Sequence, residues 1–473
     1  MAKPWATLGV DLHLEPAGPG LRRGLTDALR EAVRGGRLAP GTRLPSSRTL
    51  AADLGIARNT VAEAYADLVA EGWLTARQGS GTRVAEGIPA VPTGRRGRTG
   101  VPSTGATSSP RRERHRPAYD LRPGTPDLAS FPRAEWLKAA RRAVTAAPHD
   151  ALGYGDPRGR VELRTALAGY LARARGVRTD PGRVLVVAGF VHALQVLGAV
   201  LRARGVRAVA VESYRLDQHE RLLTAAGLRT RPLPFDGLGT DPAPLTDEGA
   251  VLLTPAHQFP MGVPLHRDRR AAVVDWARRT GGLVLEDDYD GEFRYDRQPV
   301  GALQGLDPDR VVYLGTASKS LAPGLRLAWA VLPPGLAEEA AAAKGASDTC
   351  GVLDQLTLAE FIASGAYDRQ VRSARLRYRR RRDALVTALA TASPGARVTG
   401  IAAGLHAVVN LPPGTERSVV RAATWQGLAL YGLSCFRHEA AVADPLDALV
   451  VGYGTPPDHA WAGALAALCR VLP

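Results

Sequence analysis

The chain has 473 residues, of which 45% are hydrophobic, and a formal net charge of +15 with a pI near 10.2. This length exceeds the usual size of one domain, so at least two folding units with large apolar cores are expected. The excess of basic residues suggests a polyanionic partner, although net charge alone describes solubility and electrostatic steering.

Several classes of protein are disfavoured by simple features. No apolar run approaches the roughly 20 residues of a membrane-spanning helix, and the opening stretch MAKPWATLGVDLHLEP lacks the charged start and apolar core of a signal peptide. Cys350, Cys435 and Cys469 are too few and too scattered for a disulfide framework or a metal cluster. We therefore expect a soluble, cytoplasmic protein without a metal site.

The first folding unit is expected over residues 1–85, and helices dominate it. GLRRGLTDALREAVRGGRL places its leucines on one helical face and ends in a pair of glycines. LPSSRTLAADLG predicts a short second helix, with Pro45 and Ser46 as start signals. Gly55 permits a tight turn into ARNTVAEAYADLVAEG, in which Val61, Tyr65 and Leu68 repeat at helical spacing. Two helices joined by a turn are typical of a helix-turn-helix.

A hairpin is expected directly after the third helix. GWLTARQGSGTRV contains two strand-like runs around a Gly-Ser-Gly turn. The addition of a hairpin to the helix-turn-helix predicts a winged version of that motif.

Residues 40–84 resemble the DNA-binding domain of GntR-type bacterial regulators over their whole length. The resemblance implies double-stranded operator DNA as a partner, with Arg48, Arg58, Asn59, Thr60, Gln78 and Gly79 on the DNA side, the last two at the wing tip. The alternative is that these are ordinary surface residues of a helical domain. The family usually has Ser or Thr where this chain has Ala57, so a helix cap worth about 1 kcal/mol, or a phosphate contact, is missing.

A change of composition separates this unit from the rest of the chain. Residues 86–117, EGIPAVPTGRRGRTGVPSTGATSSPRRERHRP, are rich in Gly, Pro, Ser and Thr and have no hydrophobic period, which predicts a flexible linker. Its arginines either belong to a solvated tether or add phosphate contacts that do not depend on DNA sequence.

The second unit, residues 118–473, alternates apolar runs with helical patterns. VLVVAG, AVAVES, AVLLTPA, LVLEDD and VVYLGT are predicted to be buried strands, with helical segments such as VHALQVLGAVLRARG between them. This alternation is typical of an α/β fold with a mostly parallel sheet covered on both faces. Ligands in such sheets bind at the carboxyl ends of the strands.

Two of these strand ends carry residues suited to one cofactor. LVLEDDYDGEF ends its strand in acidic residues followed by Tyr289, and LGTASKS brings two hydroxyl groups and Lys319, with Arg326 close behind. An acid, a tyrosine, a lysine and a phosphate-binding set are the groups that pyridoxal 5'-phosphate (PLP) requires. A metal site at the acidic strand end is the weaker alternative, because no His or further acid follows at ligand spacing.

The second unit resembles the fold-type I aminotransferases. The whole chain is similar to the MocR/GabR subfamily of GntR-type regulators, in which a winged helix is fused to an aminotransferase-like domain. The resemblance rests on LRPGTPDLASFPRAEW, GYGDPRGRVELRTALAGYL, TPAHQFPMG, EDDYDGEFRY and GTASKSLAPGLR, in the family's order. It implies a PLP-binding domain with a smaller C-terminal α+β subdomain from about residue 350.

Residue roles follow from this resemblance by position. Lys319 forms the Schiff base with PLP, Asp287 pairs with the pyridine nitrogen, and Tyr289 approaches the ring oxygen, with Asp288 as the weaker alternative for the nitrogen. The phosphate is held by Thr316, Ser318, Arg326 and the backbone amides of Phe190 and Val191. Tyr154 resembles the tyrosine that reaches the neighbouring subunit's phosphate, which implies a homodimer.

Three departures from the aminotransferase pattern leave roles open. HQFPMG replaces the usual Asn-Pro pair, so any contact with the ring oxygen there falls to His257 or Gln258. VESYRLDQ leaves Tyr214 or Leu216 as the residue that stacks on the ring. The late strand DALVVGYGTPP has no arginine for a substrate carboxylate, and Arg437 is the nearest candidate for binding an effector.

These features predict a PLP-dependent transcriptional regulator that senses an amine or amino-acid-like effector through an external aldimine. An active aminotransferase with an accessory DNA-binding domain is the main alternative. A DNA-binding dimer in which the cofactor domain is only a scaffold is the third.

Overall fold

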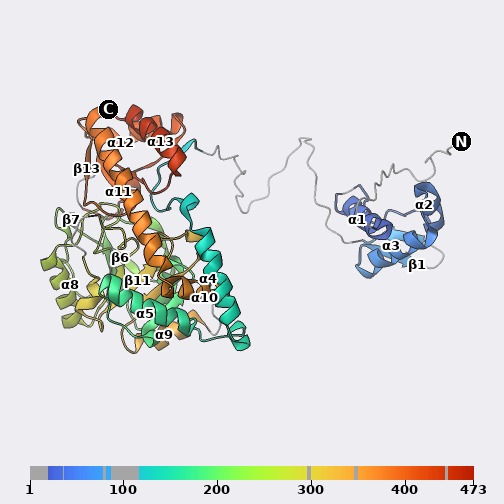
Figure 1. Ribbon diagram of the computed structural model, residues 1–473, viewed down its shortest axis with the longest axis horizontal. Helices are drawn as coiled ribbons and strands as arrows, with labels where there is room; N and C mark the ends of the chain where they lie inside the picture. Colours follow the sequence, from blue (N-terminus) through green and yellow to red (C-terminus); the bar gives the residue numbers. More distant parts are fainter. Residues whose placement is uncertain are drawn as a thin grey trace. The chain divides into compact units, whose positions relative to one another are not determined.

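The computed structural model describes residues 20–35, 37–77, 81–86, 117–295, 300–345, 350–442 and 446–473. The chain divides into two compact units, Met1–Arg112 and Glu113–Pro473 (Figure 1). Gln78, Gly79 and nearly all of the expected linker lie outside the described residues. In the described parts of the chain, no helix is long and apolar enough to cross a membrane.

The first unit contains the predicted three helices and hairpin. These are α1 (Leu21–Arg34), α2 (Ser47–Leu54) and α3 (Arg58–Ala70), followed by β1 (Leu74–Arg77) and β2 (Gly81–Val84), which pair antiparallel. Leu25 and Leu29 of α1 pack with Leu50, Val61 and Leu68 in one buried cluster. The apolar face of α1 therefore packs against α2 and α3 and stabilises the helix-turn-helix.

Local signals determine where these helices begin and end. The Ser46 hydroxyl accepts a hydrogen bond from the Thr49 amide at 3.1 Å, and Gly55 ends α2 in the left-handed region with φ 66°. Helix α3 begins after Ala57 without any side-chain cap, which confirms the missing cap. The Tyr65 hydroxyl donates to the Pro45 carbonyl at 3.0 Å and so fixes α3 against the loop before α2.

A seven-stranded sheet lies at the centre of the second unit. In pairing order the strands are β4 (Val184–Val187), β12 (Ala328–Val331), β11 (Val311–Thr316), β10 (Leu283–Asp287), β9 (Ala250–Leu253), β5 (Ala208–Glu212) and β6 (Arg229–Leu233). Only β12 runs antiparallel to its neighbours in this sheet. The five predicted strands are all present, and β6 and β12 were not predicted.

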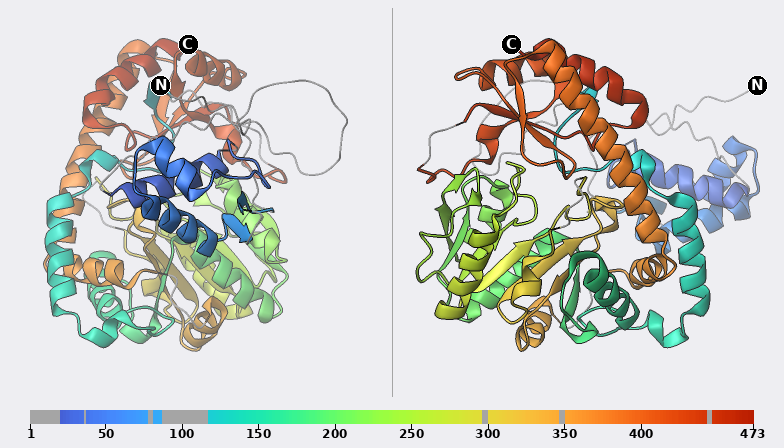
Figure 2. Two further views of the ribbon diagram at one scale, coloured as in Figure 1. Left: turned by 90° about the vertical axis from the view of Figure 1, so that its right-hand side faces the viewer. Right: turned by 60° about the vertical axis from the view of Figure 1, so that its left-hand side comes forward.

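Helices cover both faces of this sheet (Figure 2). Leu185 and Val187 of β4 belong to the core on one face, whereas Val184 and Val186 belong to the core on the other. One face is covered by α6 (Phe190–Ala203), α7 (Asp217–Ala225) and α9 (Leu336–Lys344), and the other by α4 (Arg133–Ala146), α5 (Val161–Arg175), α8 (Arg267–Thr280) and α10 (Val352–Ala363). Strands buried on both faces explain the continuous apolar runs in the sequence.

A smaller α+β subdomain follows the long helix α11 (Ala366–Ala392), which runs from α10 to this subdomain (Figure 1). Its sheet has the order β13 (Arg397–Thr399), β14 (Ala407–Asn410), β17 (Ala448–Val451) and β16 (Tyr431–Gly432), and its helices are α12 (Glu416–Trp425) and α13 (Asp458–Val471). Two short pairings complete the unit: β3 (Tyr119–Asp120) with β15 (Leu428–Ala429), and β7 (Phe235–Asp236) with β8 (Gly239–Thr240).

Candidate functional site

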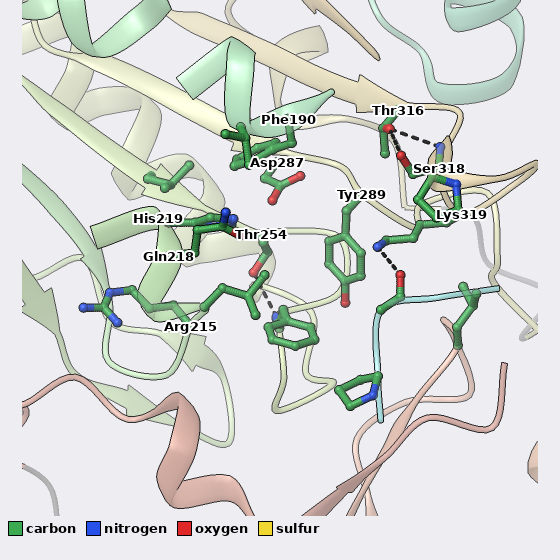
Figure 3. A pocket seen from close by; sticks show the side chains of 18 of the residues that line it. Phe190, Arg215, Gln218, His219, Thr254, Asp287, Tyr289, Thr316, Ser318 and Lys319 are labelled. Carbon is green, nitrogen blue, oxygen red and sulfur yellow. Dashed lines mark hydrogen bonds between the residues drawn. The ribbon is translucent and has the colours of Figure 1, made fainter. Parts of the chain in front are cut away.

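A cavity of about 300 Å³ lies at the carboxyl ends of β5, β9, β10 and β11 (Figure 3). Most of the predicted cofactor residues line it, namely Phe190, Val191, Leu216, Asp287, Tyr289, Thr316, Ser318, Lys319 and Arg326. The parallel strands bring these residues together from distant parts of the chain, because their carboxyl ends meet at one edge of the sheet.

Lys319 lies in the loop after β11, and its side chain reaches into the cavity (Figure 3). The Ser318 amide donates to the Thr316 hydroxyl at 3.1 Å, which turns the chain just before the lysine. The Lys319 amine donates to the Gly124 carbonyl. Burial lowers the pKa of this amine, and the nearby Asp287 and Asp290 partly oppose that effect. A lower pKa favours the neutral, nucleophilic form that condenses with a carbonyl carbon.

Asp287 and Asp288 have opposite environments. Asp288 forms a bidentate ion pair with Arg175, at 2.6 and 2.9 Å, and accepts a hydrogen bond from the Tyr313 hydroxyl at 2.8 Å. Asp287 is buried, and its Oδ1 has no hydrogen-bond partner among the described residues. Burial raises its pKa well above the usual range. Of the two acids, Asp287 is therefore the one available to a ligand in the cavity.

The start of α6 forms an anion cradle with Arg326. Gly189 is the N-cap residue of α6, with φ 89°. Because glycine has no side chain, it cannot cap the first amides of the helix. The Arg326 guanidinium donates to the Ala188 carbonyl. A Cβ on Gly189 would lie only 2.6 Å from Arg326 Nη2. Glycine is therefore required for the guanidinium to lie across the helix start, where phosphate oxygens would bind.

Tyr289 is held from outside the cavity by His257. The Tyr289 hydroxyl lies 3.1 Å from His257 Nδ1, which lies 2.9 Å from Asp290 Oδ2. Neither His257 nor Gln258, the predicted replacements for the asparagine, lines the cavity, and Phe259 lines it instead. The Gln258 amide donates to the backbone carbonyls of Tyr214 and Phe259.

His257, Asp290 and His406 are also close enough to share a metal ion, because one ligand atom of each lies within 4.8 Å of the others. His257 Nδ1 already bonds Asp290, and His406 Nε2 lies 3.0 Å from the Pro260 carbonyl oxygen. Burial lowers the pKa of His406 to about 3, so its imidazole is neutral. Hydrogen bonds within the protein are enough to explain why these side chains meet.

Of the residues left open for ring stacking and effector binding, one lines the cavity and two do not. Leu216 lines the cavity, whereas Tyr214 and Arg437 pair through their backbones outside it. The Arg437 guanidinium donates to the Ala441 carbonyl at 2.6 Å. Arg215 is the basic side chain at the cavity rim, and it forms an ion pair with Glu220. Burial lowers the pKa of Arg215 to about 10.

Sequence reasoning missed several cavity residues besides Arg215. Glu212 ends β5 and accepts hydrogen bonds from the hydroxyls of Thr240 at 2.9 Å and Thr254 at 2.6 Å, and burial raises its pKa to about 7. His219 lies with its ring centroid 4.6 Å from that of Phe190. Burial lowers the pKa of His219 to about 3. Among these residues, only Glu212 could have been found from the sequence, because it stands at the end of a predicted strand.

Tyr154 lies on the surface of the chain rather than in its cavity. Its side chain is 101% exposed, and Leu152 and Val161 nearby are 61% and 52% exposed. An exposed group of large apolar residues is typical of a subunit interface. The assignment of Tyr154 to a neighbouring subunit's site stays a prediction.

The predicted DNA-facing residues that the structure describes lie at one end of the helix-turn-helix. Arg48 is exposed on α2, and Arg58, Asn59 and Thr60 form the first turn of α3, with Arg58 and Asn59 exposed. Two acidic residues at the other end of α3, Asp67 and the C-cap residue Glu71, pair with Arg22 and Arg30 of α1 at 2.7 and 2.8 Å. These ion pairs fix the end of α3 against α1.

Comparison with known proteins agrees with both units. Residues 21–84 match the model of the bacterial regulatory proteins of the gntR family, and residues 120–441 match that of the class I and II aminotransferases. In solved structures, the chain resembles a multiple substrate aminotransferase from Thermococcus profundus, with 25% identity, a TM-score of 0.68, and coverage of 76% of this chain and 92% of that one. A Pyrococcus horikoshii kynurenine aminotransferase gives 25% identity, a TM-score of 0.67 and coverage of 76% and 91%.

Relatives that span both units are regulators. The uncharacterized HTH-type transcriptional regulator YhdI of Bacillus subtilis is 32% identical over 90% of both chains. The HTH-type pyridoxine biosynthesis transcriptional regulator PdxR of Corynebacterium glutamicum is 33% identical over 91% of both, and the probable rhizopine catabolism regulatory protein MocR of Rhizobium meliloti is 34% identical over 77% of this chain and 76% of its own. The chain belongs to the MocR/GabR subfamily of GntR-type transcriptional regulators, which join a winged helix to a fold-type I aminotransferase domain.

Proposed function

We propose that this regulator binds PLP covalently through Lys319 and responds to an amine-bearing effector by changing its occupancy of operator DNA. The observation that carries the proposal is Asp287 Oδ1, a buried carboxylate oxygen without a partner among the described residues, in the same cavity as Lys319. An unpaired buried acid costs stability unless a ligand satisfies it, and a protonated ring nitrogen is such a ligand.

The remaining groups of the cavity fit the other parts of PLP. When bound, PLP supplies an aldehyde carbon that exchanges between the lysine amine and an incoming amine. The amides of Phe190 and Val191 and the side chains of Thr316, Ser318 and Arg326 would hold the phosphate, and Tyr289 would donate to the ring oxygen. Leu216 is in a better place than Tyr214 to cover the ring, because it lines the cavity.

The proposed effector contact moves from Arg437 to Arg215. Arg215 lines the cavity, and its Nε has no hydrogen-bond partner among the described residues, whereas Arg437 does not line the cavity. A carboxylate or other anionic group on the effector would compete with Glu220 for this guanidinium. We therefore expect substitution of Arg215 to weaken the response to acidic effectors more than the response to simple amines.

The arrangement of the whole regulator is part of the proposal. Residues 1–85 would form the DNA-binding domain and residues 118–473 the PLP-binding domain, with residues 86–117 between them. Tyr154 would reach the partner subunit's phosphate in a cytoplasmic homodimer, and its full exposure in the single chain supports this role.

Covalent trapping tests the cofactor assignment. Borohydride reduction of the PLP-loaded protein should fix the cofactor on one peptide, which mass spectrometry should map to Lys319. The Lys319→Ala variant should lack both the trapped peptide and the visible absorbance band. A band of wild-type strength in Lys319→Ala, or trapping on another lysine, would refute the assignment.

An active aminotransferase is the second candidate function, and one observation favours it. The similarity to solved aminotransferases covers about three quarters of this chain, and the match to the class I and II aminotransferases, residues 120–441, includes Lys319, Asp287 and Tyr289. Steady production of a new amino acid from an amino donor and a keto acid would support turnover. A single-turnover response without steady production would support sensing alone.

A further inference from the structure

The far side of Tyr289 contacts a buried acid–histidine pair. His257 Nδ1 lies 2.9 Å from Asp290 Oδ2 and 3.1 Å from the Tyr289 hydroxyl, and His257 and Asp290 are only 3% and 2% exposed. His257 does not line the cavity, so it acts on a ligand there through its neighbours, of which Tyr289 is the one it lies beside at hydrogen-bond distance.

The hydrogen bonds of this group determine where its protons lie. A carboxylate can only accept, so an N–H at Nδ1 of His257 would donate to Asp290. The Tyr289 oxygen lies beside the same nitrogen and can accept from that N–H. Its own hydroxyl proton is then available to the Asp290 carboxylate or to a ligand in the cavity. Burial raises the pKa of Tyr289 well above its usual range, so the phenol keeps this proton.

The backbone at Gly404 packs closely against the side chains of His257 and Asp290. A Cβ at Gly404 would lie 2.4 Å from Asp290 Oδ2 and 2.4 Å from His257 Cε1, and its φ of 71° also favours glycine. The Tyr453 hydroxyl donates to the Gly404 carbonyl at 2.8 Å, and the Tyr295 hydroxyl donates to it as well. The backbone of the small subdomain at Gly404 therefore packs directly against the side chains of His257 and Asp290.

We propose that His257 and Asp290 are positioning residues that aim the Tyr289 hydroxyl proton at the phenolic oxygen of bound PLP. The inference rests on the proposed binding of PLP at Lys319. A donor aimed at this oxygen stabilises its anionic form, so it sets the pH at which the bound cofactor changes its absorbance. The other titratable groups around Tyr289 are Asp287, Glu212, Lys319 and His406, and these stay unchanged in the variants below.

The test is a pH titration of the visible spectrum of the full-length, PLP-loaded protein. His257→Phe removes the ring nitrogen, and it should raise the spectral midpoint by about one pH unit, the worth of one hydrogen bond to a charged group. Tyr289→Phe should shift the midpoint in the same direction. The double variant should shift it no further, because both changes remove one interaction.

Two more variants separate positioning from simple packing. His257→Asn places an amide nitrogen where Nδ1 lies and should return the midpoint toward that of wild type. Asp290→Asn replaces the acceptor by a group that can donate to Nδ1, so Tyr289 can donate to His257 instead, and the midpoint should rise. It also serves if the Phe variant does not fold.

The outcomes are distinct. A wild-type midpoint in both His257→Phe and Asp290→Asn, or shifts that add in the double variant, would overturn the inference while leaving PLP binding intact. The inference also fails if Tyr289→Phe leaves the midpoint unchanged. Wild-type protein without a visible band would overturn the proposed function, and this inference with it.

Discussion

Asp287 and Asp288 show how one residue of offset separates two roles. Successive side chains at the end of β10 point to opposite faces of the sheet. Asp288 therefore meets Arg175 and Tyr313 in the protein interior, whereas Asp287 meets the cavity. The same alternation places Asp288 in a buried ion pair and leaves Asp287 facing the cavity, where the proposed cofactor would bind.

Substitution of these two acids should separate binding from stability. Asp287→Asn should weaken PLP affinity by about 10- to 100-fold, the worth of a hydrogen bond to a charged group. Asp288→Asn should instead lower the free energy of unfolding by about 3–5 kcal/mol, because Arg175 loses its buried partner. Titration of each variant with PLP and denaturant unfolding measure the two effects. Equal PLP affinity in wild type and Asp287→Asn would contradict the assignment.

Residues at strand ends could be predicted from the sequence, and rim residues could not. Lys319, Asp287 and Tyr289 follow apolar strands, so their place at the sheet edge is fixed by the fold class. Arg215 and His406 lie in loops and His219 lies in the first turn of α7, and the position of these segments beside the cavity depends on tertiary packing. The prediction for Tyr214 placed it near the ring of the cofactor, whereas its buried side chain packs with Met261, Leu433 and Phe436 and does not line the cavity.

At the scale of elements, the Arg326 guanidinium can lie across the start of α6 only because Gly189 precedes the helix. Gly189→Ala would force Arg326 away from the first amides of the helix and strain a backbone with φ 89°. We expect PLP affinity to fall about tenfold or more, since one charge-assisted phosphate contact is lost. Pyridoxal, which has no phosphate, should bind wild type and variant alike.

Gly205 provides a matched control for that experiment. It follows the same helix with φ 81°, and a Cβ there would meet nothing within 4 Å. Gly205→Ala therefore carries similar backbone strain without touching Arg326, and it should leave PLP affinity unchanged. An equal loss of affinity in both variants would show that strain, not the cradle, is responsible.

Helix α3 offers a gain of stability. Ala57→Ser supplies the side-chain cap that α3 lacks, and it should raise the free energy of unfolding of the first unit by about 1 kcal/mol. Scanning calorimetry of the full chain should show the corresponding transition at higher temperature. Ser46→Ala, which removes the existing cap of α2, should lower that transition by a similar amount. Unchanged transitions in both variants would contradict this account of the helix starts.

At the scale of elements, some strands could be predicted from the sequence and others were not. Five strands could be predicted because each is a continuous apolar run buried on both faces. Strand β6 reads RTRPL, and its proline and polar residues fit a sheet edge, where no further strand needs its amides. Strand β12 lies in the apolar run LAWAVL, residues 327–332, which is as long as the runs of the predicted strands, so the sequence carried a signal for it that was missed.

At the scale of the whole molecule, the predicted DNA-facing residues and the cavity belong to different compact units. Occupancy of the cavity can affect DNA binding only if the effector favours one arrangement of the protein over another. In the proposed function, Lys319 is the group through which an amine would make this difference, because its proposed bond to PLP is the one that an amine would replace.

The most direct measurement is the affinity of the full-length protein for its own upstream DNA, with PLP bound, before and after addition of a panel of amines. For wild type, at least one amine should change the dissociation constant by about 5- to 150-fold, the usual range of coupling between two sites. Lys319→Ala should still bind the DNA but show no response to that amine. An equal response in Lys319→Ala, or no response of wild type to any amine that alters the PLP spectrum, would contradict the account.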